Sequence, residues 1–533
     1  MNRSDVVIVG GGLAGLTLAL QLRARLPALS VTVLERNTLP LPEAAHKVGE
    51  STVEIGAHYL DTVLGLEAHL RERQLRKFGF RFFFSDGERG IDHVTELGAS
   101  NYLHTPGYQL DRGILENFLV ERVRLQGMQV IAGVTVRNIA LAESGAHTVR
   151  YSLDGTEHEI AADWLVDASG RAGLLRQQLD LKVDNGHHVN AAWFRLSTRV
   201  DIDGWSRDIA WHGRCFARER WLSTNHLVGP GYWVWLIPLS SGSHSIGIVA
   251  DEAMHPLRNF NSFERALGWL HHHQPRLAES VEASRDQLQD FIALRRVSYG
   301  CKRVFSPRRW ALTGEAGLFL DPFYSPGTDF IAISNTYITD LVVRERAGES
   351  IEMHAHIYEQ IYFSFYESTL ALYRDQYAMF GDAEAMPAKV IWDYAYYWGI
   401  LCQFFFQHRL TDIVSLSRLK RELSATQVLN VRVQELVRNW ARSQRSANPA
   451  RLLDQAALPW FAELNRSLGD SLDEAAFHAR IRRNTALLHE LAAEILSRAR
   501  QAVPDIDAAD LEKALAEFGV PAGTQPLLFP SAA

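Results

Sequence analysis

Residues 5–20 read Asp-Val-Val-Ile-Val-Gly-Gly-Gly-Leu-Ala-Gly-Leu-Thr-Leu-Ala-Leu. The apolar run from Val6 to Val9 is typical of a buried parallel strand. Gly10, Gly12 and Gly15 follow in the spacing G-x-G-x-x-G. Glycines in this spacing allow a tight turn, close approach of the backbone to a pyrophosphate, and tight packing of the next helix on the strand. We therefore expect a strand, a glycine turn and a helix whose N-terminus faces phosphate groups.

An acidic residue after the next expected strand strengthens this interpretation. Val31 to Leu34 form a second apolar run, and Glu35 follows it, about twenty residues after the last glycine of the motif. A carboxylate at this place accepts hydrogen bonds from ribose hydroxyls. The alternative is a strand, turn and helix that bind no ligand. The combination of features favours a dinucleotide-binding domain.

Composition and charge exclude several classes of protein. The chain has 533 residues, 47% of them hydrophobic, which is ordinary for a globular protein of roughly two or three domains. The net charge of −7 argues against a nucleic-acid surface. Its three cysteines lie far apart, so we expect no disulfide framework, no metal site and a cytoplasmic location. The glycine turn begins by residue 10 and the most apolar stretch, 394–406, is short, so we expect no signal peptide and no membrane span.

The order of expected elements indicates an α/β protein in which a Rossmann-like domain is interrupted and then resumed. Apolar strands are expected at 162–166 and at 310–313, on either side of a strand-rich insertion. Nearly everything beyond residue 348 has helical spacing. Within the insertion, strands are expected at 191–199, 209–212, 232–238 and 243–249. The predicted segments are 1–183 and 301–347 for the nucleotide-binding domain, 184–300 for a β-rich inserted domain and 348–533 for a helical C-terminal domain.

Several features together resemble the FAD-binding half of the aromatic hydroxylase superfamily. Beside the glycine motif and Glu35, Arg112 opens a helix, and Asp-Ala-Ser-Gly-Arg at 167–171 closes a strand. Residues 232–238 read Tyr-Trp-Val-Trp-Leu-Ile-Pro, and this W-x-W-x-I-P spacing is similar to the signature of flavin-dependent halogenases. The later segment F-x-x-P-x-x-S-x-G at 319–327 resembles the second signature of that family.

The resemblance implies a two-component oxidoreductase with an inserted substrate domain. In the family a separate flavin reductase supplies FADH2, which reacts with O2 to give a flavin hydroperoxide. Chloride or bromide attacks the distal oxygen and forms hypohalous acid. A lysine then holds this oxidant, or becomes a chloramine, beside an electron-rich ring, because an ammonium that hydrogen-bonds hypohalous acid makes its halogen more electrophilic.

The family's lysine lies between a V-G-E-S segment and a G-F-x-F run, and Lys77 occupies that place here. Lys77 is therefore the predicted catalytic residue, with Lys47 as the poorer candidate. The alternative is a strand-end lysine in solvent. The resemblance also implies FAD contacts, and the expected residues are Gly10, Gly12, Gly15, Glu35, Val48, Gly49, Glu50, Ser51, Arg112, Glu315 and Asp321.

The tryptophan-rich strand has two interpretations. Trp233, Trp235 and Ile237 share one face by two-residue alternation, and the other face is apolar too, so the pattern alone indicates a buried strand. The resemblance implies that these side chains, together with Pro238, form a wall between flavin and substrate. Such a wall blocks direct hydroxylation and forces the oxidant to diffuse.

The second signature departs from the family. Ser325, Pro326 and Gly327 are the implied halide and flavin loop, in which backbone N–H groups hold a halide ion. Pro326 has no N–H, so one donor is missing. Glu315 replaces the family's usual aspartate, and Tyr324 replaces a glutamate of the tryptophan-specific branch. Free tryptophan is therefore a poorer candidate substrate than a phenol, which its own oxygen activates.

These observations predict an FADH2-dependent halogenase of an electron-rich aromatic, of phenol or pyrrole type, either free or bound to a carrier protein. The alternatives are an FAD-dependent aromatic hydroxylase and a flavin-binding protein whose halide site has decayed. The aromatic-rich stretch 356–406 is the candidate lining of a substrate pocket, although packed helices explain each aromatic residue more simply. Asp375, Asp393 and His408 are candidates to orient a phenol.

Overall fold

The computed structural model describes residues 2–42, 49–85, 87–215, 218–443, 446–517 and 526–530. The chain forms two compact units, each built from three stretches. The first unit comprises Met1–Gln74, Leu110–Asn185 and Ser298–Tyr366. The second comprises Leu75–Gln109, Gly186–Val297 and Glu367–Ala533. The predicted division into segments 1–183, 184–300, 301–347 and 348–533 stays a prediction.

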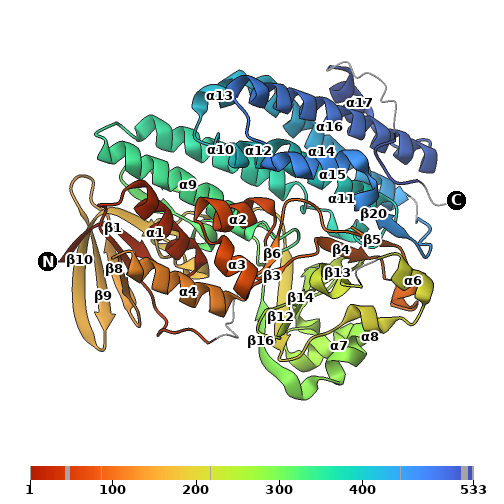
Figure 1. Ribbon diagram of the computed structural model, residues 1–533, viewed down its shortest axis with the longest axis horizontal. Helices are drawn as coiled ribbons and strands as arrows, with labels where there is room; N and C mark the ends of the chain where they lie inside the picture. Colours follow the sequence, from red (N-terminus) through yellow and green to blue (C-terminus); the bar gives the residue numbers. More distant parts are fainter. Residues whose placement is uncertain are drawn as a thin grey trace. The chain divides into compact units, whose positions relative to one another are not determined.

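The first unit is built on a largely parallel sheet, as the glycine stretch predicts (Figure 1). Its strands have the order β18-β19-β10-β1-β2-β7, and a β8–β9 hairpin extends from β10. Val7 on β1 lies opposite Leu165 on one side and Thr32 on the other, both in parallel pairs. The strands are β1 (Asn2–Val9), β2 (Val31–Leu34), β7 (Gln129–Ile131), β8 (Thr135–Ala140), β9 (His147–Leu153), β10 (Thr156–Asp167), β18 (Phe305–Ser306) and β19 (Trp310–Leu312). A separate pair is formed by β11 (Lys182–Val183) and β17 (Gly300–Cys301).

The helices of the first unit include the one predicted after the glycine turn. The α-helices are α1 (Leu13–Arg25), α2 (Glu54–His58), α3 (Glu67–Arg73), α4 (Arg112–Leu125), α5 (Leu174–Gln178), α9 (Gly327–Arg346) and α10 (Glu352–Leu370), whose last turn passes into the second unit. Between α2 and α3 the helical path is interrupted by a π-helical turn at Tyr59–Val63 and by Gly65, whose φ is +66°. The predicted α/β class with a Rossmann-like domain is confirmed.

The second unit is built on a mixed sheet of order β16-β12-β15-β14-β13-β4-β5-β20. Its pairs are antiparallel except β4 with β13 and β5 with β20, which are parallel. The strands are β4 (Phe80–Phe83), β5 (Glu96–Gly98), β12 (Val189–Leu196), β13 (Thr224–Gly229), β14 (Tyr232–Pro238), β15 (His244–Asp251), β16 (Leu288–Leu294) and β20 (Leu452–Asp454). A short pair is formed by β3 (Leu75–Arg76) and β6 (Tyr108–Gln109).

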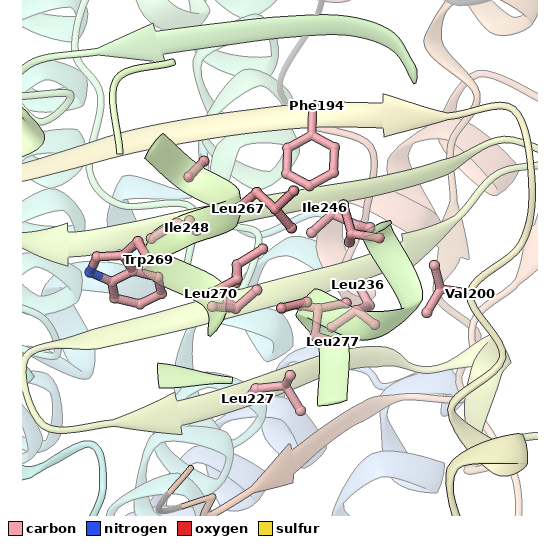
Figure 2. Close-up of a cluster of buried hydrophobic side chains, with 14 of the residues drawn as sticks. Phe194, Val200, Leu227, Leu236, Ile246, Ile248, Leu267, Trp269, Leu270 and Leu277 are labelled. Atoms are coloured by element: carbon pink, nitrogen blue, oxygen red, sulfur yellow. The ribbon is translucent and has the colours of Figure 1, made fainter. Parts of the chain in front are cut away.

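One face of this sheet is buried against two helices, α7 (Phe263–His273) and α8 (Pro275–Glu282). Figure 2 shows Leu236 and Ile246 of the sheet beside Leu270 and Leu277 of the helices. Alternation along β12, β14 and β15 assigns every second side chain to this core. The remaining side chains, among them Trp233, lie on the opposite face of the sheet.

The C-terminal part of the second unit is mainly helical, as predicted, and α14 and α16 lie side by side (Figure 1). Its helices are α11 (Ala385–Tyr396), α12 (Cys402–Phe406), α13 (Ile413–Arg418), α14 (Lys420–Ser443), α15 (Pro459–Arg466), α16 (Glu474–Ala502) and α17 (Ala509–Ala516). One local prediction is wrong. Residues 209–212 form helix α6 (Ile209–Gly213), not a strand, because Asp208 caps the helix by accepting from the Ala210 N–H. Strand β20 is a short exception within the helical region. In the described part of the chain, none of the helices has the length and apolar character to cross a bilayer.

Candidate functional site

The glycine turn after β1 is fixed by close packing. Gly10 has a φ of +114°, and a Cβ there would lie 2.2 Å from the Ala168 carbonyl oxygen. A Cβ on Gly15 would lie 2.0 Å from the Gly10 carbonyl oxygen. Both positions exclude any larger residue, because such separations are far inside van der Waals contact. The turn and the start of α1 are therefore tightly packed against β10.

Gly12 differs from its neighbours, because the space beside it is open. It caps α1, and a Cβ there would meet only the Glu116 Oε1 atom, at 4.0 Å. Its backbone is thus accessible at the positive end of a helix, where N–H groups attract a pyrophosphate. The residues present fit the phosphate end of a dinucleotide such as FAD.

Glu35, at the end of β2, is buried and held in place. Its Oε2 accepts from the Gly11 N–H at 2.6 Å, and its Oε1 accepts from the Asn37 N–H at 2.8 Å and side-chain amide at 2.7 Å. A carboxylate has about four acceptor positions, so the oxygens keep capacity for ribose hydroxyls. The geometry fits the role that the sequence predicts for this residue.

Arg112 begins α4 and joins this helix to the loop before α2. Its Nε donates to Glu116 Oε1 at 3.1 Å, and its Nη1 donates to the Gly49 carbonyl at 3.3 Å. Gly49 has a φ of +89°, and a Cβ there would lie 2.9 Å from Arg112 Nη1. The Glu50 carbonyl accepts from the Leu110 N–H at 2.7 Å, so the start of α4 and this loop are tied together.

Ser51 and Glu50, next in the same loop, are buried. Val48 and Lys47 lie outside the described residues. The roles of Val48, Gly49, Glu50 and Ser51 as FAD contacts stay predictions.

Glu315 forms an ion pair with Arg171 of the turn that follows β10. Its carboxylate lies 3.1 Å from Arg171 Nε, and the two side chains are 30% and 32% exposed. The neighbouring Gly314 packs against α1, since a Cβ on Gly314 would lie 3.1 Å from the Ala14 Cβ. The Tyr299 hydroxyl donates to the Glu315 carbonyl at 2.7 Å, and burial raises the pKa of that phenol. The Glu315 carboxylate thus remains accessible near the start of α1.

The Asp167–Arg171 turn is organised by the Asp167 carboxylate. It accepts from the Ser169 N–H at 2.9 Å and the Leu175 N–H at 2.7 Å, while burial raises the pKa of this carboxyl. The turn therefore has a fixed shape beside Gly10. Asp321 has the same kind of role, because its Oδ1 accepts from the Phe323 N–H at 2.8 Å.

The predicted halide loop is a strained turn before α9. Tyr324 and Ser325 have φ values of 65° and 53°, which non-glycine residues adopt mainly at ligand sites and sharp turns. The Ser325 N–H donates to the Pro322 carbonyl at 2.9 Å, and Pro326 caps the helix. Since Ser325's N–H is already used and Pro326 has none, the first free donor position of the loop is the Gly327 N–H.

Lys77 lies in the second unit, in the short connection between β3 and β4. The residue is only 5% exposed, so it is not the solvent lysine that the simpler interpretation expects. Its N–H donates to the Gly107 carbonyl at 2.9 Å, and its Nζ lies 3.4 Å from the centre of the Phe80 ring. Such a cation–π contact stabilises the charged ammonium in an apolar setting.

The tryptophan strand is β14, and the side chains of Trp233 and Trp235 lie on the sheet face opposite the α7–α8 core. Trp233 Nε1 donates to the Tyr377 hydroxyl at 2.9 Å, and Trp235 Nε1 donates to Ser245 Oγ at 3.1 Å. The two indole rings are 5.6 Å apart. A Cβ on Gly247 would lie 2.2 Å from the Trp235 ring, so the next strand leaves space for this indole. Ile237 and Pro238, further along β14, are buried too.

The structure brings Lys77 and the tryptophan strand into one aromatic cluster. His226 on β13 lies 5.2 Å from the Phe80 ring and 5.2 Å from the Trp233 ring. Phe80 also lies 6.1 Å from Tyr394 of α11. The sequence does not predict His226, because β13 is not expected there, and Tyr394 lies within the aromatic-rich stretch 356–406 without a signal that distinguishes it.

The three residues considered for orienting a phenol are poorly placed for that role. Asp375 and His408 are exposed at the surface of the second unit. Asp393 is buried, but it pairs with the Lys389 ammonium and accepts from Gln434 Nε2 at 2.7 Å. These contacts explain Asp393 as part of a polar network between α11 and α14.

Comparisons with known proteins find similarity to FAD-binding domains and to flavin-dependent halogenases. The family model described as FAD binding domain matches residues 3–242. The flavin-dependent halogenase chlA of Dictyostelium discoideum is 27% identical over 474 residues, covering 80% of this chain and 76% of the relative. A 1H-pyrrole-2-carbonyl peptidyl-carrier-protein chlorinase of Pseudomonas fluorescens is 27% identical over 353 residues, covering 63% of this chain and 74% of the relative.

Solved structures share the fold. The halogenase PltM, in complex with phloroglucinol and FAD, aligns with a TM-score of 0.65 at 18% identity, over 93% of this chain and 96% of its own. The flavin-dependent brominase Bmp2 aligns with a TM-score of 0.55 at 21% identity, over 70% of this chain and 87% of its own.

Proposed function

This chain belongs to the flavin-dependent halogenase family, and from that premise we propose that Lys77 directs halogenation of an electron-rich aromatic ring. The proposed reaction uses FADH2 from a separate reductase, O2, and chloride or bromide. The observation that carries the proposal is the burial of the Lys77 ammonium on the Phe80 ring, within the aromatic cluster that contains Trp233.

Residues of the first unit hold the cofactor in this proposal. The backbone of Gly12 and the N-terminus of α1 face the pyrophosphate, and Glu35 binds the ribose. Arg112, Gly49, Glu50, Ser51, Glu315 and Asp321 are proposed contacts of the rest of FAD. When bound and reduced, FAD would supply two electrons to O2, and the halide ion would supply the other two as it is oxidised to hypohalous acid, with water as the second product.

Lys77 acts on the oxidant through its charge. The ammonium donates a hydrogen bond to the oxygen of hypohalous acid and makes the halogen more electrophilic. The ring carbon then forms a bond to the halogen as the oxygen–halogen bond breaks, and the oxygen leaves as water with the proton that the ring carbon loses. The cation–π contact with Phe80 orients the Lys77 ammonium for this step.

Trp233 and Trp235 are proposed to form the wall that keeps substrate away from the flavin. Their fixed indoles support this role, because each ring is buried and each N–H is hydrogen-bonded. A rigid apolar wall favours a diffusing oxidant over direct transfer of oxygen. The alternative reaction, aromatic hydroxylation, requires the substrate to meet the flavin directly.

The proposed substrate is a phenol or a pyrrole, free or on a carrier protein. Related chlorinases and brominases act on a pyrrole-2-carbonyl group held on a peptidyl carrier protein, and the solved PltM complex holds phloroglucinol, a phenol. Both rings are electron-rich without help from a base. Tyr324 stands where the tryptophan-specific branch has a glutamate, which favours such self-activated rings.

One observation favours the alternative functions, an aromatic hydroxylase or a flavin-binding protein whose halide site is weakened. In the loop before α9, the Ser325 N–H is already bonded to Pro322 and Pro326 has no N–H. Assays with FADH2, O2, halide and a phenol or a carrier-bound pyrrole separate these functions. Halogenated product supports the first proposal, hydroxylated product supports a hydroxylase, and no turnover supports a flavin-binding protein.

The decisive variant is Lys77→Ala, with Lys302→Ala at an exposed lysine of the first unit as the control. We expect Lys77→Ala to abolish halogenated product while oxidation of FADH2 continues, since the flavin chemistry belongs to other residues. Lys302→Ala should behave as the wild type. Normal halogenation by Lys77→Ala would remove this lysine from the reaction.

A further inference from the structure

His226 occupies the middle of the aromatic cluster in the second unit. In the sheet register it lies opposite Phe82 of β4 on one side and Trp235 of β14 on the other. Its neighbour Leu227 belongs to the α7–α8 core, so His226 points to the opposite face of the sheet. The residue is fully buried there.

The contacts of this imidazole connect the lysine to the tryptophan strand. Its ring stacks on Phe82 at 4.6 Å with an interplanar angle of 22°. It meets Phe80 nearly edge-on, at 5.2 Å and 75°, and lies 5.2 Å from Trp233. His226 therefore packs against Phe80, the ring that the Lys77 ammonium contacts.

The charge state of His226 suits this position. Burial and, to a smaller extent, the nearby Lys77 ammonium lower the pKa of its imidazole to about 3, so the ring is neutral at physiological pH. Nδ1 lies 3.4 Å from the Arg81 carbonyl oxygen, which can only accept, so Nδ1 carries the proton. A neutral ring fills the space beside Lys77 without adding a second positive charge.

We propose that His226 is a positioning residue for Lys77. The His226 ring packs against Phe80 and Trp233, and so fixes the orientation of the Phe80 ring that the Lys77 ammonium contacts. The position of the Lys77 charge is thereby fixed. The inference rests on the proposed function, because positioning matters only if Lys77 handles the oxidant. The proposal gives a role to His226 on β13, which lies outside the two sequence motifs that contain Lys77 and Trp233.

The test compares His226→Ala and His226→Phe. Loss of the ring should lower the halogenated product formed per FADH2 oxidised by about tenfold, because a small displacement of a reacting group has a large effect on rate. His226→Phe keeps an aromatic ring in the same place and should remain within about twofold of the wild type. Oxidation of FADH2 and binding of FAD should be unchanged in both variants.

His244→Ala is the matched control. His244 is equally buried in the same sheet, with its pKa also lowered to about 3 by burial, but it shares its strand face with Ile246 of the α7–α8 core. Its removal should lower stability as much as His226→Ala, without changing the yield per FADH2. An equal loss of yield in both alanine variants would mean that His226 is only structural.

The remaining outcomes separate this inference from the proposed function. If Lys77→Ala abolishes halogenation and His226→Ala does not reduce it, the positioning role is wrong and the proposed function stands. If Lys77→Ala still halogenates, both are wrong.

A spectroscopic measurement needs no turnover. In enzyme with 13C-labelled histidine, the Cε1 resonance of His226, assigned by its loss in His226→Phe, should shift in Lys77→Ala and not in Lys302→Ala. An unchanged resonance would contradict the coupling of the two side chains.

Discussion

The ammonium nitrogen of Lys77 lies 3.4 Å from the centre of the Phe80 ring, although the two residues are near neighbours in the chain. Gly79, with a φ of +69°, turns the backbone between them. The Lys77 N–H is bonded to the Gly107 carbonyl and the Phe78 N–H to the Leu222 carbonyl. Backbone contacts on both sides therefore direct the lysine onto the ring rather than into solvent.

Replacement of Phe80 by leucine should weaken the reaction without stopping it. The change removes a cation–π contact of about 1–2 kcal/mol at a desolvated site, so the yield of halogenated product per FADH2 should fall about fivefold to thirtyfold. Phe83→Leu is the control, because Phe83 is buried on the same strand but faces the α7–α8 core. Equal yields from the two variants would contradict a role for the Phe80 ring.

The glycine motif gives opposite predictions at two positions. Gly15→Ala should prevent proper folding or lower the melting temperature strongly, because its Cβ would meet the Gly10 carbonyl oxygen at 2.0 Å. Gly12→Ala should leave the melting temperature of the FAD-free protein unchanged, since the nearest atom lies 4.0 Å away. It should nevertheless weaken FAD binding, measured by flavin fluorescence, because a methyl group would occupy the path to the pyrophosphate. Unchanged FAD affinity in Gly12→Ala would mean that the cofactor lies elsewhere.

The local patterns were predictable from the sequence. The strand at 232–238 has the expected bounds, and its alternation correctly separates the face of Trp233 from that of Leu236. The glycine turn could be predicted because the spacing of its glycines reflects local steric constraints. At residues 209–212 the apolar pattern predicts a strand, but Asp208 is an N-cap residue and the segment is a helix. The capping residue is the sequence signal that identifies this helix.

The cluster around Lys77 was not predictable, because it depends on pairing between distant segments. Strand β4 pairs in parallel with β13, more than a hundred residues later, and this pairing sets His226 beside Phe80. Residues 224–229 read Thr-Asn-His-Leu-Val-Gly, which lacks a clear apolar alternation. The sequence motifs identify the lysine and the tryptophans, whereas the fold brings the His226 ring between them.

The buried histidines should make the protein less stable in mild acid. The pKa values of His226 and His244 are lowered from 6.5 to about 3 by burial, so the unfolded chain binds protons that the folded chain does not. The two histidines therefore do not lower the free energy of unfolding above pH 6.5. As the pH falls from 6.5 towards 3, that free energy decreases by about 1.4 kcal/mol per pH unit for each histidine. His244→Phe should remove one such contribution, which urea unfolding at several pH values would measure. A slope equal to that of the wild type would show that His244 is protonated in the folded state.

The halide loop gives the last prediction. Pro326→Thr restores an N–H at the cap of α9, and threonine is itself a favourable cap residue, so the helix should keep its start. If the loop binds halide, one added hydrogen bond to an ion contributes about 1.5 kcal/mol, and half-maximal halogenation should need about tenfold less halide. Pro326→Ala separates the two changes, because it supplies the N–H without the hydroxyl and should show the same shift. Halide titrations that match the wild type in both variants would place the ion away from this loop, and the strained φ values of Tyr324 and Ser325 would then serve only to turn the chain into α9.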